Sequence, residues 1–132
     1  MFSPDGKWIA YRSDESGRNE IWVQSFPDAG LKRQLSTNGG SSPLWSRDGQ
    51  ELFYIEGNRL MAVTLDTTEG LSASRPQRLT QVRGQYSAFT GYDISRDGER
   101  FLIVQEEATE PQQIRVVLDW FEELERLAPR DN

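Results

Sequence analysis

The chain has 132 residues, and its 15 Lys and Arg against 21 Asp and Glu give a formal net charge of −6, which disfavours a nucleic-acid or anionic-membrane surface. It contains neither cysteine nor histidine, which excludes disulfides, thiolate metal sites and any imidazole base. No apolar run approaches the roughly 18 residues of a membrane span, and the first residues lack the pattern of a secretory signal. We therefore expect a soluble protein, cytoplasmic or periplasmic, that binds no nucleic acid and inserts into no membrane.

Three short segments share one pattern, in which an apolar residue and a serine precede one variable position and then Asp-Gly. The segments are residues 2–6, 45–49 and 94–98. Glycine permits the positive φ of a tight turn, and the aspartate can accept hydrogen bonds from backbone N–H groups of the same turn. With one aspartate per repeat, the carboxylates lie too far apart to share one metal ion. We therefore predict a structural turn motif without a metal or cofactor, made of Asp5, Gly6, Asp48, Gly49, Asp97 and Gly98.

The residues after each turn predict a pair of strands. β-Branched and aromatic residues dominate short runs at 8–11, 52–55 and 101–104, and such runs are typical of strands buried on both faces. A second strand is predicted after a hairpin connection in each repeat, at 20–23, 60–63 and 114–117. The first two repeats add a polar strand that suits a sheet edge, at 32–35 and 77–80, and strands at 42–45 and 90–94 enter the later turns.

A repeat of about 45 residues with four strands is typical of a propeller blade. The predicted fold is all-β, a partial β-propeller of about three four-stranded antiparallel blades with a short C-terminal helix. Within one domain of residues 1–132, we place the blades at about 1–41, 42–86 and 87–119 and the helix at about 120–127. The helix has Asp119 as its N-cap, with Glu122 three residues on.

The segment Phe2-Ser3-Pro4-Asp5-Gly6-Lys7-Trp8-Ile9-Ala10-Tyr11 resembles the repeat of TolB-type, WD-repeat-like β-propellers. The later segments are similar, with Arg47 and Arg96 at the position that proline usually holds. The stretch from Tyr92 to Trp120 is similar to the last blades of large bacterial propellers, which are often fused to serine/threonine kinase or regulatory domains. The resemblance implies a non-catalytic module for protein–protein interaction.

No catalytic residue is predicted. The glutamates at 106–107 and 122–125 lie in predicted surface, and the chain offers no nucleophile–base pair. Residues 82–91 form a long connection into the last blade, and such loops carry recognition on rigid scaffolds. The candidate partner-binding residues are Arg83, Gln85, Tyr86 and Phe89.

Three blades are fewer than the four to eight of closed propellers. Two sheet faces would then be uncovered, and aromatic residues such as Trp8, Tyr11, Trp22, Phe53 and Tyr54 would face water. We therefore expect self-association, as a dimer of three-blade halves that completes a six-bladed ring, or a protein partner. The alternatives are a truncated fragment of a longer propeller with no independent function, and a propeller enzyme such as a glycoside hydrolase.

Overall fold

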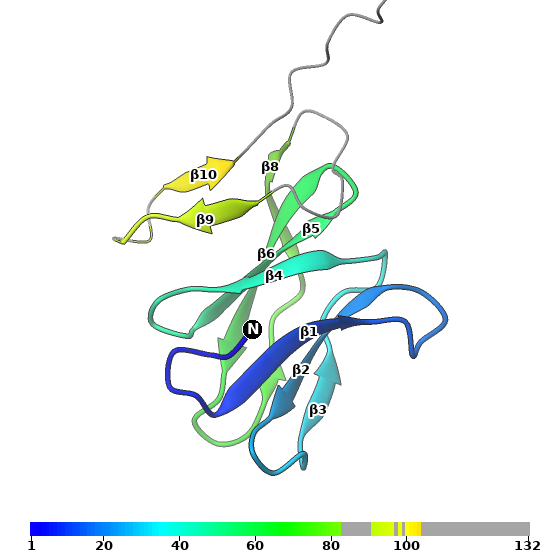
Figure 1. The fold of residues 1–132 in the computed structure, drawn as a ribbon, viewed down its shortest axis with the longest axis vertical. Helices are drawn as coiled ribbons and strands as arrows, with labels where there is room; N and C mark the ends of the chain where they lie inside the picture. Colours follow the sequence, from blue (N-terminus) through cyan, green and yellow to red (C-terminus); the bar gives the residue numbers. More distant parts are fainter. Residues whose placement is uncertain (83–90, 97, 99, 104–132) are drawn as a thin grey trace, which may run out of the picture.

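The computed structural model describes residues 1–82, 91–96, 98 and 100–103, and these residues form antiparallel β-sheets (Figure 1). The first sheet has the order β1 (Trp8–Ser13), β2 (Glu20–Ser25) and β3 (Lys32–Gln34). An isolated bridge between Phe2 and Ile9 adds the start of the chain beside β1. The short β3 is polar and mostly exposed, as expected for a sheet edge.

The second sheet is built around β5 (Glu51–Glu56) and β6 (Arg59–Asp66), with β4 (Ser41–Trp45) on the other side of β5. Two strands share the free edge of β6. The exposed β8 (Gln77–Gln81) pairs with its first half, and β7 (Ser72–Ala73) pairs with its last two residues. A third sheet has two strands, β9 (Tyr92–Ile94) and β10 (Phe101–Ile103).

The second sheet lies between the other two and is therefore buried on both faces. Successive side chains of its strands point alternately to one face and the other. Leu52 and Tyr54 of β5 point to the first sheet, whereas Phe53 and Ile55 point to the third. The core between the first and second sheets also contains Trp8, Ala10, Ile21, Val23, Leu35, Trp45, Met61, Val63 and Leu65. The core between the second and third sheets also contains Leu60, Ala62, Val82 and Ile94.

The all-β prediction is confirmed, and the sheets follow one another in chain order. Their arrangement is compatible with successive propeller blades, but the sheets of the described residues do not close into a ring. The expected helix at 120–127 lies outside the described residues, and the blade boundaries stay predictions. The described part of the chain contains no helix long and apolar enough to cross a membrane.

The expectation that Trp8, Phe53 and Tyr54 face water is wrong. All three are buried, because the second sheet lies between the other two and covers one face of each. Tyr11 and Trp22 are half-buried on the other face of the first sheet. Open faces therefore occur only on the two outer sheets of the described structure.

Candidate functional site

The first two Asp-Gly turns and the described residues of the third lie on one side of the molecule, at the left in Figure 1, and they share the same hydrogen bonds. In the first turn the N–H of Gly6 donates to the carbonyl oxygen of Ser3 at 2.9 Å, and the N–H of Trp8 donates to Ser3 Oγ at 3.0 Å. The glycines have φ values of 71°, 73° and 77°, which lie in the left-handed region that favours glycine. The same two bonds recur at Ser46, from Gly49 and Glu51, and at Ser95, from Gly98 and Arg100.

The turn aspartates act as local hydrogen-bond acceptors. Asp5 Oδ1 accepts a bond from Ser3 Oγ at 2.6 Å and one from the N–H of Lys7 at 3.1 Å. Asp48 Oδ1 accepts equivalent bonds from Ser46 Oγ at 2.6 Å and from the N–H of Gln50 at 3.0 Å. These bonds lower the pKa of both carboxyl groups, with the serine hydroxyl having the largest effect and the backbone N–H the next largest.

Asp97 lies outside the described residues. Gly98 belongs to the described part of the third turn and has a similar φ and the equivalent backbone bond to its counterparts. Within the described part of the chain, no three His, Cys, Asp or Glu residues lie close enough together to hold a metal ion.

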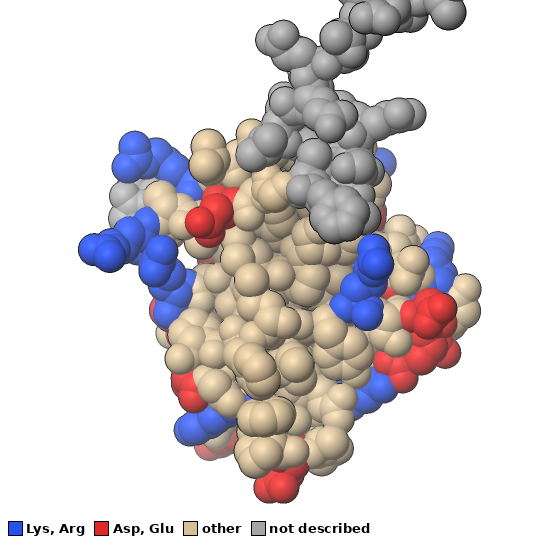
Figure 2. All heavy atoms as spheres, viewed as in Figure 1, with Lys and Arg blue, Asp and Glu red and all other residues tan. Residues whose placement is uncertain are grey.

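A hollow of about 410 Å³ lies between the second and third turns. Two arginines line it, Arg47 and Arg96, which hold the variable position of the motif in successive repeats. Both are exposed, and neither forms an ion pair with a described residue. Figure 2 shows basic side chains along the edge where these turns lie. The other lining residues are Ser46, Asp48, Glu51, Ile94 and Gly98.

This hollow combines two guanidinium groups with a carboxylate that the turns do not use. Arginine presents several N–H donors in a fork that matches phosphate and carboxylate oxygens. The carboxylate of Asp48 accepts hydrogen bonds within its turn. Glu51 contributes only backbone groups to the turn: its N–H donates to Ser46 Oγ at 2.9 Å, and its carbonyl oxygen accepts from the N–H of Ser46 at 2.9 Å. The arrangement can bind an anionic group beside a carboxylate. We call this hollow the arginine hollow.

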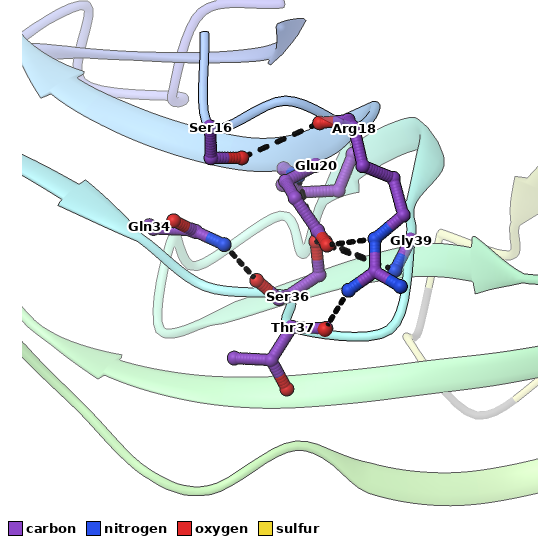
Figure 3. Close-up of polar contacts among 8 residues, drawn as sticks. Ser16, Arg18, Glu20, Gln34, Ser36, Thr37 and Gly39 are labelled. Atoms are coloured by element: carbon purple, nitrogen blue, oxygen red, sulfur yellow. Dashed lines mark hydrogen bonds and ion pairs between the residues drawn. The ribbon is translucent and has the colours of Figure 1, made fainter. Parts of the chain in front are cut away.

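A buried carboxylate lies at the end of the first sheet away from the Asp5-Gly6 turn, where it accepts several hydrogen bonds (Figure 3). Glu20, at the start of β2, is 1% exposed, and its oxygens accept bonds from Arg18 Nε at 2.8 Å and from the N–H of Gly39 at 3.1 Å. Ser36 Oγ also donates to Glu20 and accepts a bond from the N–H of Ile21 at 2.8 Å. These contacts fasten the segment between β3 and β4 to the start of β2.

Burial by itself would raise the pKa of Glu20, but the bonds from Ser36, Gly39 and Arg18 outweigh it and hold the pKa below its ordinary value. Glu20 therefore stays ionised at neutral pH with its acceptors occupied. A second guanidinium nitrogen of Arg18 donates to the carbonyl oxygen of Thr37. Because the carboxylate is enclosed and fully engaged, this cluster has a structural role in the chain.

The structure places only part of the predicted site. Arg83, Gln85, Tyr86 and Phe89 lie outside the described residues, so their role as partner-binding residues stays a prediction. The glutamates at 106–107 and 122–125 also lie outside them.

Sequence reasoning missed the arginine hollow and the Glu20 cluster. The only signal for the hollow was the arginine that replaces the usual proline, at Arg47 and Arg96. No local signal distinguishes Glu20, because its partners Ser36 and Gly39 follow 16 and 19 residues later.

No family model matches the chain. No curated protein matches it. Among solved structures, the chain is similar to a putative 6-phosphogluconolactonase from Bacteroides uniformis, with a TM-score of 0.54 and 20% sequence identity. The likeness covers 80% of this chain and 32% of that one, so this chain spans about a third of the length of the solved protein. At this identity the likeness shows a shared fold.

These comparisons correct the expected family and function. The resemblance to TolB-type propellers is not supported, because no family model matches and the similar solved protein has a different name. The predictions of a non-catalytic interaction module and of no enzymatic activity are wrong on the same finding, since that protein is named as an enzyme. The physical reason is that a turn motif fixes the scaffold, whereas a site is assembled from side chains of several sheets.

Proposed function

We propose that the chain contributes to an enzyme that hydrolyses phosphorylated sugar lactones. The observation that carries this proposal is the likeness in fold to the Bacteroides protein, whose name specifies such a lactone as its substrate. The three sheets are then consecutive blades of a propeller, with the Asp-Gly turns repeated along one rim. The arginine hollow between two of these turns supplies a suitable binding site.

The phosphate of the substrate matches the two arginines. A phosphate monoester carries close to two negative charges at neutral pH, and Arg47 and Arg96 place two permanent positive charges in one hollow of an acidic chain. Arginine can bind two phosphate oxygens at once, which orients the sugar as well as holding it. The arginine hollow therefore binds the phosphate in this proposal.

The carboxylate of Glu51 is the group in the hollow that can act on water. In lactone hydrolysis, water attacks the carbonyl carbon, the ring C–O bond breaks, and the ring oxygen leaves as a hydroxyl after taking a proton. Glu51 removes the proton of the attacking water and returns it to the leaving oxygen in this proposal. This chemistry needs neither a histidine nor a cysteine, so the composition is compatible with it.

The direct test follows the hydrolysis of 6-phosphogluconolactone with the purified chain, against the spontaneous rate. We expect acceleration, and we expect Arg47→Ala and Arg96→Ala each to raise KM, by roughly tenfold for the loss of a charged hydrogen bond. Arg78→Ala is the control, because Arg78 is an exposed arginine of β8 outside the hollow. Hydrolysis no faster than in buffer would overturn the proposal, as would equal effects of all three substitutions.

A second substrate separates phosphate binding from the chemical step. Unphosphorylated gluconolactone lacks the group that the arginines recognise, so its KM should not respond to Arg47→Ala. Glu51→Gln should lower kcat for both lactones, because it removes the proton acceptor while keeping the size of the side chain. A response of both lactones to the arginine substitution would contradict the assigned role of Arg47.

A further inference from the structure

The outer face of the first sheet carries half-buried and exposed apolar side chains, together with Gln24, which pairs with Ile9 in the register and accepts a hydrogen bond from Tyr11. Its residues follow from the alternation along β1 and β2: Trp8, Ala10, Ile21 and Val23 point to the second sheet, so the residues between them point away. Phe2 joins this face through its bridge to Ile9, and its ring contacts Phe26 edge to face at 4.9 Å. We call it the leading face, made of Phe2, Ile9, Tyr11, Trp22 and Phe26.

The equivalent face of the second sheet is fully buried. The turn hydrogen bonds align Trp8 with Glu51, so Ile9 and Tyr11 correspond to Leu52 and Tyr54. Those two residues have no exposed surface, because the first sheet covers them. The leading face is therefore built like a face that receives a preceding sheet.

The leading face retains groups that a partner would cover. Phe2 is 51% exposed and Phe26 is 47% exposed. The indole N–H of Trp22 is shielded from solvent yet has no hydrogen-bond partner in the described structure. Lys32 lies 4.8 Å from the centre of the Trp22 ring, and its ammonium forms an ion pair with Glu15. Because the chain's own atoms already cover this N–H, the exposed rings of Phe2 and Phe26 are the surface left for a partner to cover.

The opposite end of the described structure has a complementary open face. The same alignment equates Leu102 of β10 with Ala10 and Phe53, which are buried against the next sheet. Leu102 is instead 70% exposed. Its partner in the strand register, Asp93, lies on the same side and is exposed. We call this the trailing face, made of Leu102 and Asp93.

We propose that the leading face of one chain docks on the trailing face of a second copy. Each face has the alternation that, within the chain, packs one sheet on the next, so the contact repeats the geometry of the two internal cores. Within the chain, Trp8 and Ala10 of the first sheet pack on Leu52 and Tyr54, the face of the second sheet that corresponds to the leading face. This internal contact joins two different faces, which favours leading face on trailing face over leading face on leading face. Such a contact is heterologous, because it joins two different surfaces.

Sedimentation velocity of the full chain from about 1 to 100 µM tests the proposal over the affinity range of moderate complexes. We expect association beyond the 15.1 kDa of one chain. Phe2→Arg on the leading face and Leu102→Arg on the trailing face should each raise the dissociation constant at least tenfold, which corresponds to about 1.4 kcal/mol. Leu79→Arg is the matched control, since Leu79 is 47% exposed on β8 and lies on neither face.

Mixing the two variants identifies the pairing. Phe2→Arg keeps an intact trailing face and Leu102→Arg keeps an intact leading face, so their mixture should form heterodimers that neither variant forms alone. Circular dichroism of each variant shows that it is folded. A chain of 15.1 kDa at every concentration, or association that Leu102→Arg leaves unchanged, would overturn the proposal. Failure of the mixture to associate would overturn the heterologous pairing.

Discussion

The hydroxyl of Tyr92 in β9 donates a hydrogen bond of 2.7 Å to the carbonyl oxygen of Ser42 in β4, fifty residues earlier in the chain. The bond joins the third sheet to the second where β4 is irregular. The register between β4 and β5 shifts between Ser41 and Leu44, and Ser42 has a φ of 52°. Burial raises the pKa of Tyr92, so the hydroxyl remains a donor at neutral pH.

Tyr92→Phe removes this bond and keeps the ring. We expect a loss of about 1 kcal/mol in the free energy of unfolding, because the carbonyl of Ser42 then loses its partner. That loss corresponds to a fall of roughly 3 °C in Tm for a chain of this size. Tyr11→Phe is the control, since the Tyr11 hydroxyl bonds to Gln24 of its own sheet at 3.1 Å. A larger effect of the control would contradict a linking role for Tyr92.

Ser42→Gly should stabilise the chain, unlike most glycine substitutions in strands. A left-handed conformation costs a residue with a Cβ about 1–2 kcal/mol, and glycine avoids this cost while losing about 0.5–1 kcal/mol through its flexibility. We expect a net gain of about 0.5 kcal/mol, seen as a small rise in Tm. Ser41→Gly, one residue earlier and without a positive φ, should lower Tm. Equal changes at both positions would show that Ser42 is not strained.

Glu20→Ala should be among the most destabilising single changes in the described chain. It leaves Ser36, the N–H of Gly39 and the Arg18 guanidinium without their shared acceptor, which costs about 3 kcal/mol. Glu20→Gln keeps the shape and one acceptor oxygen, so its cost should be smaller, about 2 kcal/mol. Chemical denaturation measures both. A cost below about 0.5 kcal/mol for the alanine variant, the size of an ordinary surface substitution, would contradict the account of the cluster.

The same cluster predicts how stability depends on pH. The pKa of Glu20 is lowered in the folded chain, so its contribution is present above the ordinary value of 4.5 and is lost as the pH falls through the folded value. We expect the difference in unfolding free energy between the native chain and Glu20→Gln to shrink as the pH falls below 4.5. Denaturation at neutral and acid pH measures this difference. A constant difference would contradict the pKa assignment.

The local parts of this structure could be predicted from sequence, and the long-range parts could not. The turns at Gly6 and Gly49 follow from residues within one short segment, which is why their equivalence was visible. The contact between Tyr92 and Ser42 depends on how two sheets pack, and nothing in either segment encodes the other. The arginine hollow has the same origin, because Arg47 and Arg96 meet only when successive turns are placed side by side.

Gly40→Ala tests the packing of the segment that Glu20 fastens. A Cβ at Gly40 would lie 2.5 Å from Cγ1 of Ile21 and 2.9 Å from Oγ of Ser36, so both β2 and the segment after β3 would have to shift. We expect a loss of about 1–3 kcal/mol in the free energy of unfolding, as for other overpacked sites. Gly30→Ala is the control, because its Cβ would have only an ordinary contact, 3.9 Å from Ser25 Oγ, and no positive φ is found there. Thermal melts of both variants decide the point, and a Gly40→Ala protein as stable as Gly30→Ala would show that the close approach of this segment to β2 is not required.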